Sequence, residues 1–74
     1  MKYVKSKFRA SWTGVVIDIQ KRRNKLNPLY TCVIIKDSNG NTPRKRIIRI
    51  LDSSWLVEVE QFDISHINKD WLKL

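Results

Sequence analysis

A chain of 74 residues has room for one small domain, and we predict a single domain spanning residues 1–74. Its composition, 42% hydrophobic and 30% charged, excludes a wholly disordered chain, and its length excludes a multidomain enzyme. Fifteen Lys and Arg against seven Asp and Glu give a net charge of +8, which points to a polyanionic partner, with nucleic acid ahead of an anionic surface.

The first part of the chain predicts two strands followed by a basic loop. Residues 3–8 are a candidate first strand. Residues 15–20 alternate apolar and other side chains with a period of two and are rich in β-branched residues, which favours a second strand. Residues 21–28 are polar and basic and close on a proline, which is typical of a loop.

The middle of the chain predicts three more strands. Residues 30–36 and 55–59 are short β-rich runs, and residues 44–51 begin with a cluster of basic side chains. The loop at 37–43 contains Asn39-Gly40, a strong signal for a tight hairpin turn.

The run at 44–51 needs one face for the core, because neighbouring side chains of a strand alternate between its two faces. We expect Ile48 and Ile50 to point inward, and Lys45 and Arg49 to point outward.

The last segment, residues 63–72, places Ile64, Ile67, Trp71 and Leu72 at helical intervals, which predicts a short helix or 3₁₀ turn. We expect Ile67 and Trp71 to cap an open end of the fold. The elements together predict a mainly all-β fold: a small SH3-like antiparallel barrel of four or five strands with a short C-terminal helical turn.

Three stretches resemble known families. Residues 8–19, with a glycine followed by alternating aliphatic side chains, resemble the opening of KOW-type barrels, although Ala10 and Ser11 stand where that family has a second glycine. Residues 43–49 are similar to the basic strand of the SH3-like DNA-binding domain of retroviral integrases. A Trp-x-Gly-Val-Val opening at residues 12–16, Arg44-Lys45 and Ser54-Trp55-Leu56 resemble short basic proteins of tailed bacteriophages. That resemblance implies an accessory protein acting in the host cytoplasm.

The charge is concentrated in two places. Residues 1–50 carry thirteen Lys and Arg against two acids, whereas residues 51–74 carry two Lys against five acids. The candidate phosphate-binding side chains lie in the first loop and in the basic run: Lys21, Arg22, Arg23, Lys25, Arg44, Lys45, Arg46 and Arg49. We expect the loop and the run to converge on one groove. The alternatives are a solvated hairpin tip for the loop and protection against edge pairing for the run.

Two aromatic residues flank the basic loop. Trp12 and Tyr30 are candidates for stacking on unpaired bases, with packing in the core or at the rim as the alternative. We assign four other aromatic residues to the core: Phe8, Trp55, Phe62 and Trp71.

The residues offer little support for catalysis. His66 and Cys32 are the only histidine and the only cysteine, so zinc spacing and an evident nucleophile–base pair are missing. Cys32 lies in the middle of a strand and is expected to be a buried apolar residue, and the acids at 58–63 are expected to be solvated. We expect no enzymatic activity, no cofactor and no metal.

The first hypothesis for function is a nucleic-acid-binding module that contacts phosphates with low sequence specificity. The alternative is a protein-interaction module, such as a phage-type inhibitor or adaptor of a host protein, whose basic face docks an acidic surface. The sequence lacks an apolar run long enough for a membrane helix, so we expect a cytoplasmic protein without a membrane partner. DNA or RNA, single or double strand, and the oligomeric state stay open.

Overall fold

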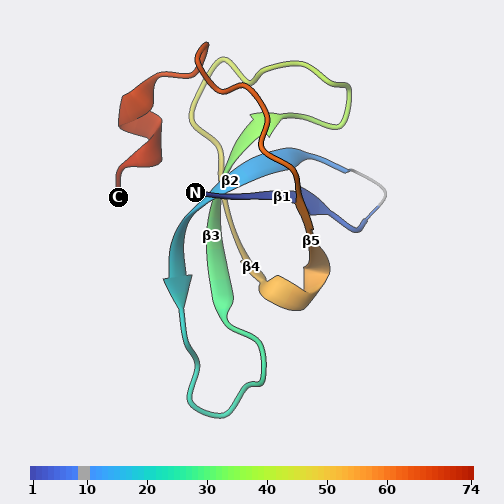
Figure 1. Ribbon diagram of the computed structural model, residues 1–74, viewed down its shortest axis with the longest axis vertical. Helices are drawn as coiled ribbons and strands as arrows, with labels where there is room; N and C mark the ends of the chain where they lie inside the picture. Colours follow the sequence, from blue (N-terminus) through green and yellow to red (C-terminus); the bar gives the residue numbers. More distant parts are fainter. Residues whose placement is uncertain (9–10) are drawn as a thin grey trace.

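The computed structural model describes residues 1–8 and 11–74, which form one curled, five-stranded antiparallel sheet (Figure 1). The order across the sheet is β4-β3-β2-β1-β5, so β4 and β5 are the two edges. The fold is a curled half-barrel, which confirms the prediction of a mainly all-β antiparallel fold with five strands and a short C-terminal helical turn. The elements are β1 (Lys2–Ser6), β2 (Thr13–Gln20), β3 (Leu29–Lys36), β4 (Ile48–Asp52), the 3₁₀ turn η1 (Ser53–Trp55), β5 (Leu56–Val59) and the 3₁₀ turn η2 (Lys69–Leu72).

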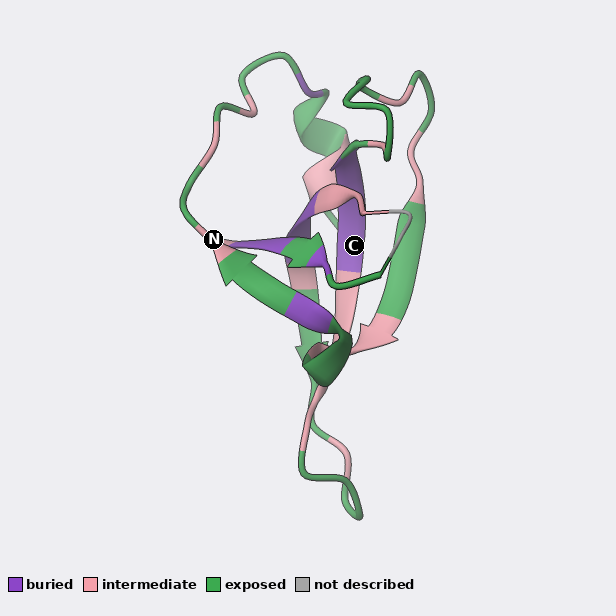
Figure 2. Cartoon of the chain, turned by 90° about the vertical axis from the view of Figure 1, so that its right-hand side faces the viewer, coloured by how far each residue is buried: buried purple, intermediate pink, exposed green. Residues whose placement is uncertain are grey.

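The longest strands, β2 and β3, are buried on both faces over much of their length. Adjacent residues such as Val15 and Val16, or Cys32 and Val33, belong to two different apolar clusters, because neighbouring side chains leave a strand on opposite sides. The buried residues follow the central strands, while the loops and the far ends of the strands are exposed (Figure 2). Burial on both faces explains why apolar residues occupy adjacent positions, at Val15-Val16 in β2 and from Cys32 to Ile35 in β3.

The C-terminal segment covers one face of the sheet. Ile67 is buried against Tyr3, Val15, Val33 and Ile35, and Trp71 and Leu72 pack on the same cluster. The short helical element is therefore confirmed as a 3₁₀ turn, η2. Its position differs from the expectation, because it lies over a sheet face where we expected it to cap an open end.

The other apolar cluster lies on the opposite face, inside the curl of the sheet. It contains Val4, Val16, Cys32 and Leu56. Cys32 is fully buried, as predicted, and burial raises the pKa of its thiol to about 11.

The predicted tight turn is present at Asn39-Gly40. The Gly40 amide donates to the Asp37 carbonyl at 3.0 Å, and Gly40 has a φ of 82°, which favours glycine. The chain does not enter a strand directly after this turn.

The prediction for the basic run is wrong in two respects. β4 begins at Ile48, so Arg44, Lys45 and Arg46 lie outside it. Ile48 and Ile50 are 38% and 59% exposed, because the C-terminal segment covers the central strands and leaves this edge uncovered.

Two of the four aromatic residues assigned to the core are exposed. Phe8 is 55% exposed and Trp55 is 48% exposed, so the core assignment is wrong for both. Phe62 and Trp71 are half-buried and pack against the cluster under the C-terminal segment.

Candidate nucleic-acid interface

The loop between β2 and β3 displays three of its four cations to solvent. Lys21, Arg23 and Lys25 are exposed, whereas Arg22 is half-buried. The Arg22 guanidinium donates to the Asn27 carbonyl through Nε at 3.3 Å and through Nη2 at 2.7 Å. These bonds connect the two sides of the loop. Arg22 therefore stabilises the loop conformation in which Lys21, Arg23 and Lys25 are exposed.

Arg22 also ties the loop to the end of β4. Its Nη2 donates to Asp52 Oδ2 at 2.6 Å, and Asp52 Oδ1 accepts the Ser54 amide at 2.8 Å. The Ser54 amide, together with Arg22, holds the pKa of Asp52 down at about 2. The guanidinium of Arg22 therefore stabilises the fold through contacts within the protein. The exposed Arg23 side chain is the one available to bind a phosphate.

The basic run before β4 shows the same division of roles. Arg44 and Lys45 are exposed, but Arg46 is half-buried and its Nη2 donates to the Lys73 carbonyl at 2.6 Å. Arg46 thus fastens the start of β4 to the C-terminal segment. Arg49 is exposed in the middle of β4.

The expected convergence of the two basic segments is wrong. The first loop leads into the first residue of β3, and the segment 37–47 leaves its last residue, so they lie at opposite ends of this strand (Figure 1). β3 has eight residues, a length of about 26 Å. A loop closing a hairpin and the next connection necessarily fall at opposite ends of the strand that they share.

The exposed cations of these two segments, with Arg49, instead run along the β3–β4 side of the sheet. The first loop stands at the end of β4, Arg49 lies in its middle, and Arg44 and Lys45 precede its start. We call this set the basic array; its members are Lys21, Arg23, Lys25, Arg44, Lys45 and Arg49.

Three of the seven acidic residues lie on the other edge strand, β5, or in the segment that follows it. Glu58 is exposed on β5, and Glu60 and Asp63 are exposed in the segment that follows it. β4 and β5 are opposite edges, so the charges are partly separated. The separation is incomplete, because Asp52 ends β4 and Lys5 is exposed on β1 beside β5.

Trp12 and Tyr30, the predicted stacking residues, are half-buried and pack against the inner cluster. The Tyr30 hydroxyl accepts a hydrogen bond from Lys2 Nζ at 3.2 Å, which raises the pKa of that lysine. The same ammonium lies 5.3 Å from the centre of the ring. Both rings therefore already have packing partners.

Sequence reasoning missed the exposed aromatic pair formed by Phe8 and Trp55. Their ring centroids are 5.4 Å apart and their planes stand at 88° to one another. Basic residues beside Phe8, at Lys5 and Lys7, were the signal available in the sequence. It was overlooked because an aromatic residue in a small domain is more often core.

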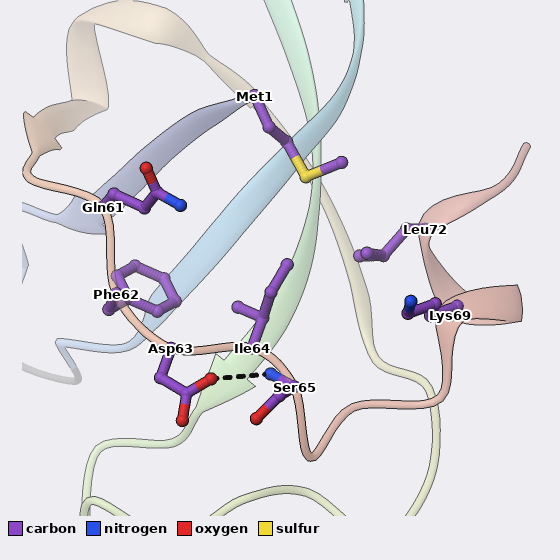
Figure 3. Close-up of a pocket in the computed structure, with 8 residues that line it drawn as sticks. All are labelled: Met1, Gln61, Phe62, Asp63, Ile64, Ser65, Lys69 and Leu72. Carbon is purple, nitrogen blue, oxygen red and sulfur yellow. Dashed lines mark hydrogen bonds between the residues drawn. The ribbon is translucent and has the colours of Figure 1, made fainter.

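A cavity of about 560 Å³ lies under the C-terminal segment, and none of the predicted site residues lines it. Met1, Ile64 and Leu72 point into it, and the Asp63 carboxylate at its edge accepts the Ser65 amide at 2.9 Å (Figure 3). Its lining is mainly apolar and continues the cluster on that face of the sheet.

The described residues contain no group of three or more His, Cys, Asp or Glu side chains arranged to hold a metal ion. Within residues 1–8 and 11–74, no helix has the length and apolar character needed to cross a bilayer.

Comparisons with known families, curated proteins and solved structures return no match to this chain. The case for a function therefore depends on the geometry of its own residues.

Proposed function

We propose that this protein binds nucleic acid through the phosphate backbone, with low sequence specificity. The observation that carries the proposal is the basic array, whose six exposed cations extend along the β3–β4 side of the sheet. Neutralising phosphates releases condensed counterions, and this term is independent of sequence.

The size and shape of the molecule support contact with several phosphates at once. Its longest dimension is 37 Å, which corresponds to about eleven base pairs of duplex at about 3.4 Å each. The helical elements of the described chain are 3₁₀ turns of three and four residues, too short to act as recognition helices in a major groove. Low specificity follows from this combination.

The protein-interaction alternative has one observation in its favour. Ile48 and Ile50 are exposed on the edge strand β4, and such an edge can pair with a strand of a partner. Binding of this kind depends on backbone hydrogen bonds and apolar contacts, and it weakens much less with salt than phosphate binding does.

The resemblance of residues 8–19 to KOW-type barrels is consistent with nucleic-acid binding and is part of this proposal. A phage-type origin and a cytoplasmic location are also part of it. Within that stretch, Arg9 and Ala10 lie outside the described residues.

The test is fluorescence anisotropy with labelled duplex DNA, single-stranded DNA and RNA over a range of roughly 50–300 mM salt. If all six cations of the basic array meet phosphates, log K against log salt falls with a slope of about −5 on duplex DNA, or about −4 on a single strand. Arg23→Ala/Lys25→Ala should make this slope shallower by about two, because each phosphate contact contributes about one.

The control removes the same charge elsewhere. Lys69→Ala/Lys73→Ala changes two exposed lysines of the C-terminal segment and should leave the slope nearly unchanged. Equal losses from both double variants would show that net charge alone drives binding, and absence of binding by the wild-type protein would refute the proposal. Salt-insensitive capture of a protein would favour the alternative.

A further inference from the structure

Two hydrogen bonds hold the backbone next to the exposed aromatic pair, one to a backbone carbonyl and one to a serine hydroxyl. The Lys7 amide donates to the Trp55 carbonyl at 3.1 Å, and the Phe8 amide donates to Ser6 Oγ at 3.2 Å. Phe8 and Trp55 thus occupy defined positions although neither is buried. In an edge-to-face pair the edge of one ring covers one face of the other, and about half of each residue is exposed to solvent.

The turn η1 joins this pair to the basic loop. At one end of η1, the Ser53 amide donates to the Pro28 carbonyl, at the close of the loop, at 3.0 Å. Trp55 is the last residue of η1. Its backbone lies about 4 Å from that of Ser53, because a 3₁₀ helix rises about 2 Å per residue. Asp52, which precedes η1, receives the hydrogen bond from Arg22 described above. The loop and the aromatic pair are therefore linked through η1 and Asp52.

The charges near the pair favour a polyanion. Lys5 and Lys7 are exposed on the chain that leads to Phe8, and Lys21, Arg23 and Lys25 lie beyond η1. An open aromatic ring between cations is the combination that binds single strands, because bases stack on the ring while phosphates contact the cations. A duplex presents no free base face to such a ring.

We infer that the preferred ligand is single-stranded nucleic acid, whose unpaired bases stack on Phe8 and Trp55 while its phosphates contact the first loop. This inference rests on the proposed function and names its substrate class. It moves the stacking role from Trp12 and Tyr30, which pack on the inner cluster, to the pair that is exposed.

The experiment compares three labelled oligonucleotides of one length: a single strand, the matching duplex, and a single strand whose central nucleotides are abasic. The wild-type protein should bind the single strand more tightly than both others, since the abasic strand keeps the phosphates and lacks the bases. Trp55→Ala should weaken single-strand binding about 5- to 150-fold, the range that corresponds to loss of one base–aromatic stack. Duplex and abasic binding should change less than about twofold on the same reasoning.

Two readouts separate stacking from charge and from misfolding. The salt slope of Trp55→Ala should equal that of the wild-type protein, because no phosphate contact is removed. Trp55→Phe should recover most of the affinity, because it restores an aromatic face. Ile50→Ala is the matched control, an exposed apolar residue on the opposite edge of the sheet, and should bind all three oligonucleotides like the wild-type protein.

The outcomes distinguish this inference from the proposed function. Equal weakening of single-strand and duplex binding by Trp55→Ala, or equal affinity of the wild-type protein for the intact and abasic strands, would overturn the stacking site and leave phosphate binding in place. Unchanged binding of every oligonucleotide by Trp55→Ala would likewise overturn it. Failure of the wild-type protein to bind any oligonucleotide would remove the proposed function itself.

Discussion

Arg22 and Arg23 show how differently two identical neighbouring side chains can be used. Arg22 bonds to the Asn27 carbonyl and to Asp52, whereas Arg23 is exposed in the same loop. A charge count treats the two as equal, yet only Arg23 is free to contact phosphate. Arg46 and Arg44 divide in the same way, since Arg46 bonds to the Lys73 carbonyl.

The carboxylate of Asp52 should make stability depend on pH in the acidic range. Its pKa is about 2 in the folded protein, against about 3.9 for an unfolded chain. The stabilisation is therefore complete above about pH 4 and is lost as the pH falls towards 2. Asp52→Asn, which keeps a residue able to cap η1, should be less stable than wild type at pH 7 and should lose less stability between pH 4 and 2.

Urea denaturation at a series of pH values measures this effect. Asp70→Asn is the control, because Asp70 forms a surface ion pair with Lys73 at 3.6 Å whose contribution should be small. If the curves for Asp52→Asn and wild type run parallel between pH 4 and 2, the Arg22–Asp52 contact does not stabilise the fold through its charge.

At the scale of elements, β2 is shaped by a glycine and by irregular pairing. Its register with β3 shifts between Thr13 and Gly14 and again between Val16 and Asp18. At the first shift the two strands approach closely: a Cβ on Gly14 would lie 2.7 Å from the Val33 carbonyl oxygen and 3.0 Å from the Trp12 ring. Irregular pairing of this kind increases the bend of a strand, which suits a curled sheet.

Gly14→Ala should therefore destabilise the protein by about 1–3 kcal/mol, the usual cost of overpacking. The Val33 oxygen belongs to the backbone of the central strand β3, so it cannot move aside as a flexible side chain can. Chemical denaturation measures the loss. Gly40→Asn provides the comparison, because Gly40 has open space around it and asparagine tolerates its φ of 82°. A Gly14→Ala protein as stable as wild type would show that the strands can separate locally at no cost.

At the scale of the whole molecule, the sheet has an apolar cluster on each face. The strands curl around the cluster that contains Val4, Val16, Cys32 and Leu56 and so bury it themselves. The other depends on the C-terminal segment, where Ile67 is the buried contact to the central strands. Arg46 adds a polar link between this segment and the chain before β4. The segment is therefore part of the fold that holds the basic array.

Ile67→Ala should cost about 2–5 kcal/mol, the range for removing a large buried aliphatic side chain. A small domain has a total stability of only about 5–15 kcal/mol, so the loss should be large in a thermal or urea unfolding curve. His66→Ala is the matched control, since His66 is exposed next to it and should change stability by less than about 0.5 kcal/mol. Equal small effects from both variants would mean that the segment does not stabilise the sheet.

The sequence by itself determined the all-β fold, the approximate positions of the five strands and the tight turn at Gly40, because alternation, β-branched runs and turn residues are local signals. It also determined that the chain is strongly basic and that its acids lie towards the C-terminus. These properties depend on residues close together in the chain.

Only the tertiary structure decided which cations are free, which aromatics are exposed and where the basic segments lie. Arg22 meets Asp52 thirty positions away, and Ile48 and Ile50 stay exposed because the covering segment lies over other strands. Phe8 and Trp55 meet only when β1 pairs with β5. Each of these outcomes is set by a contact between distant parts of the chain, which no local pattern encodes.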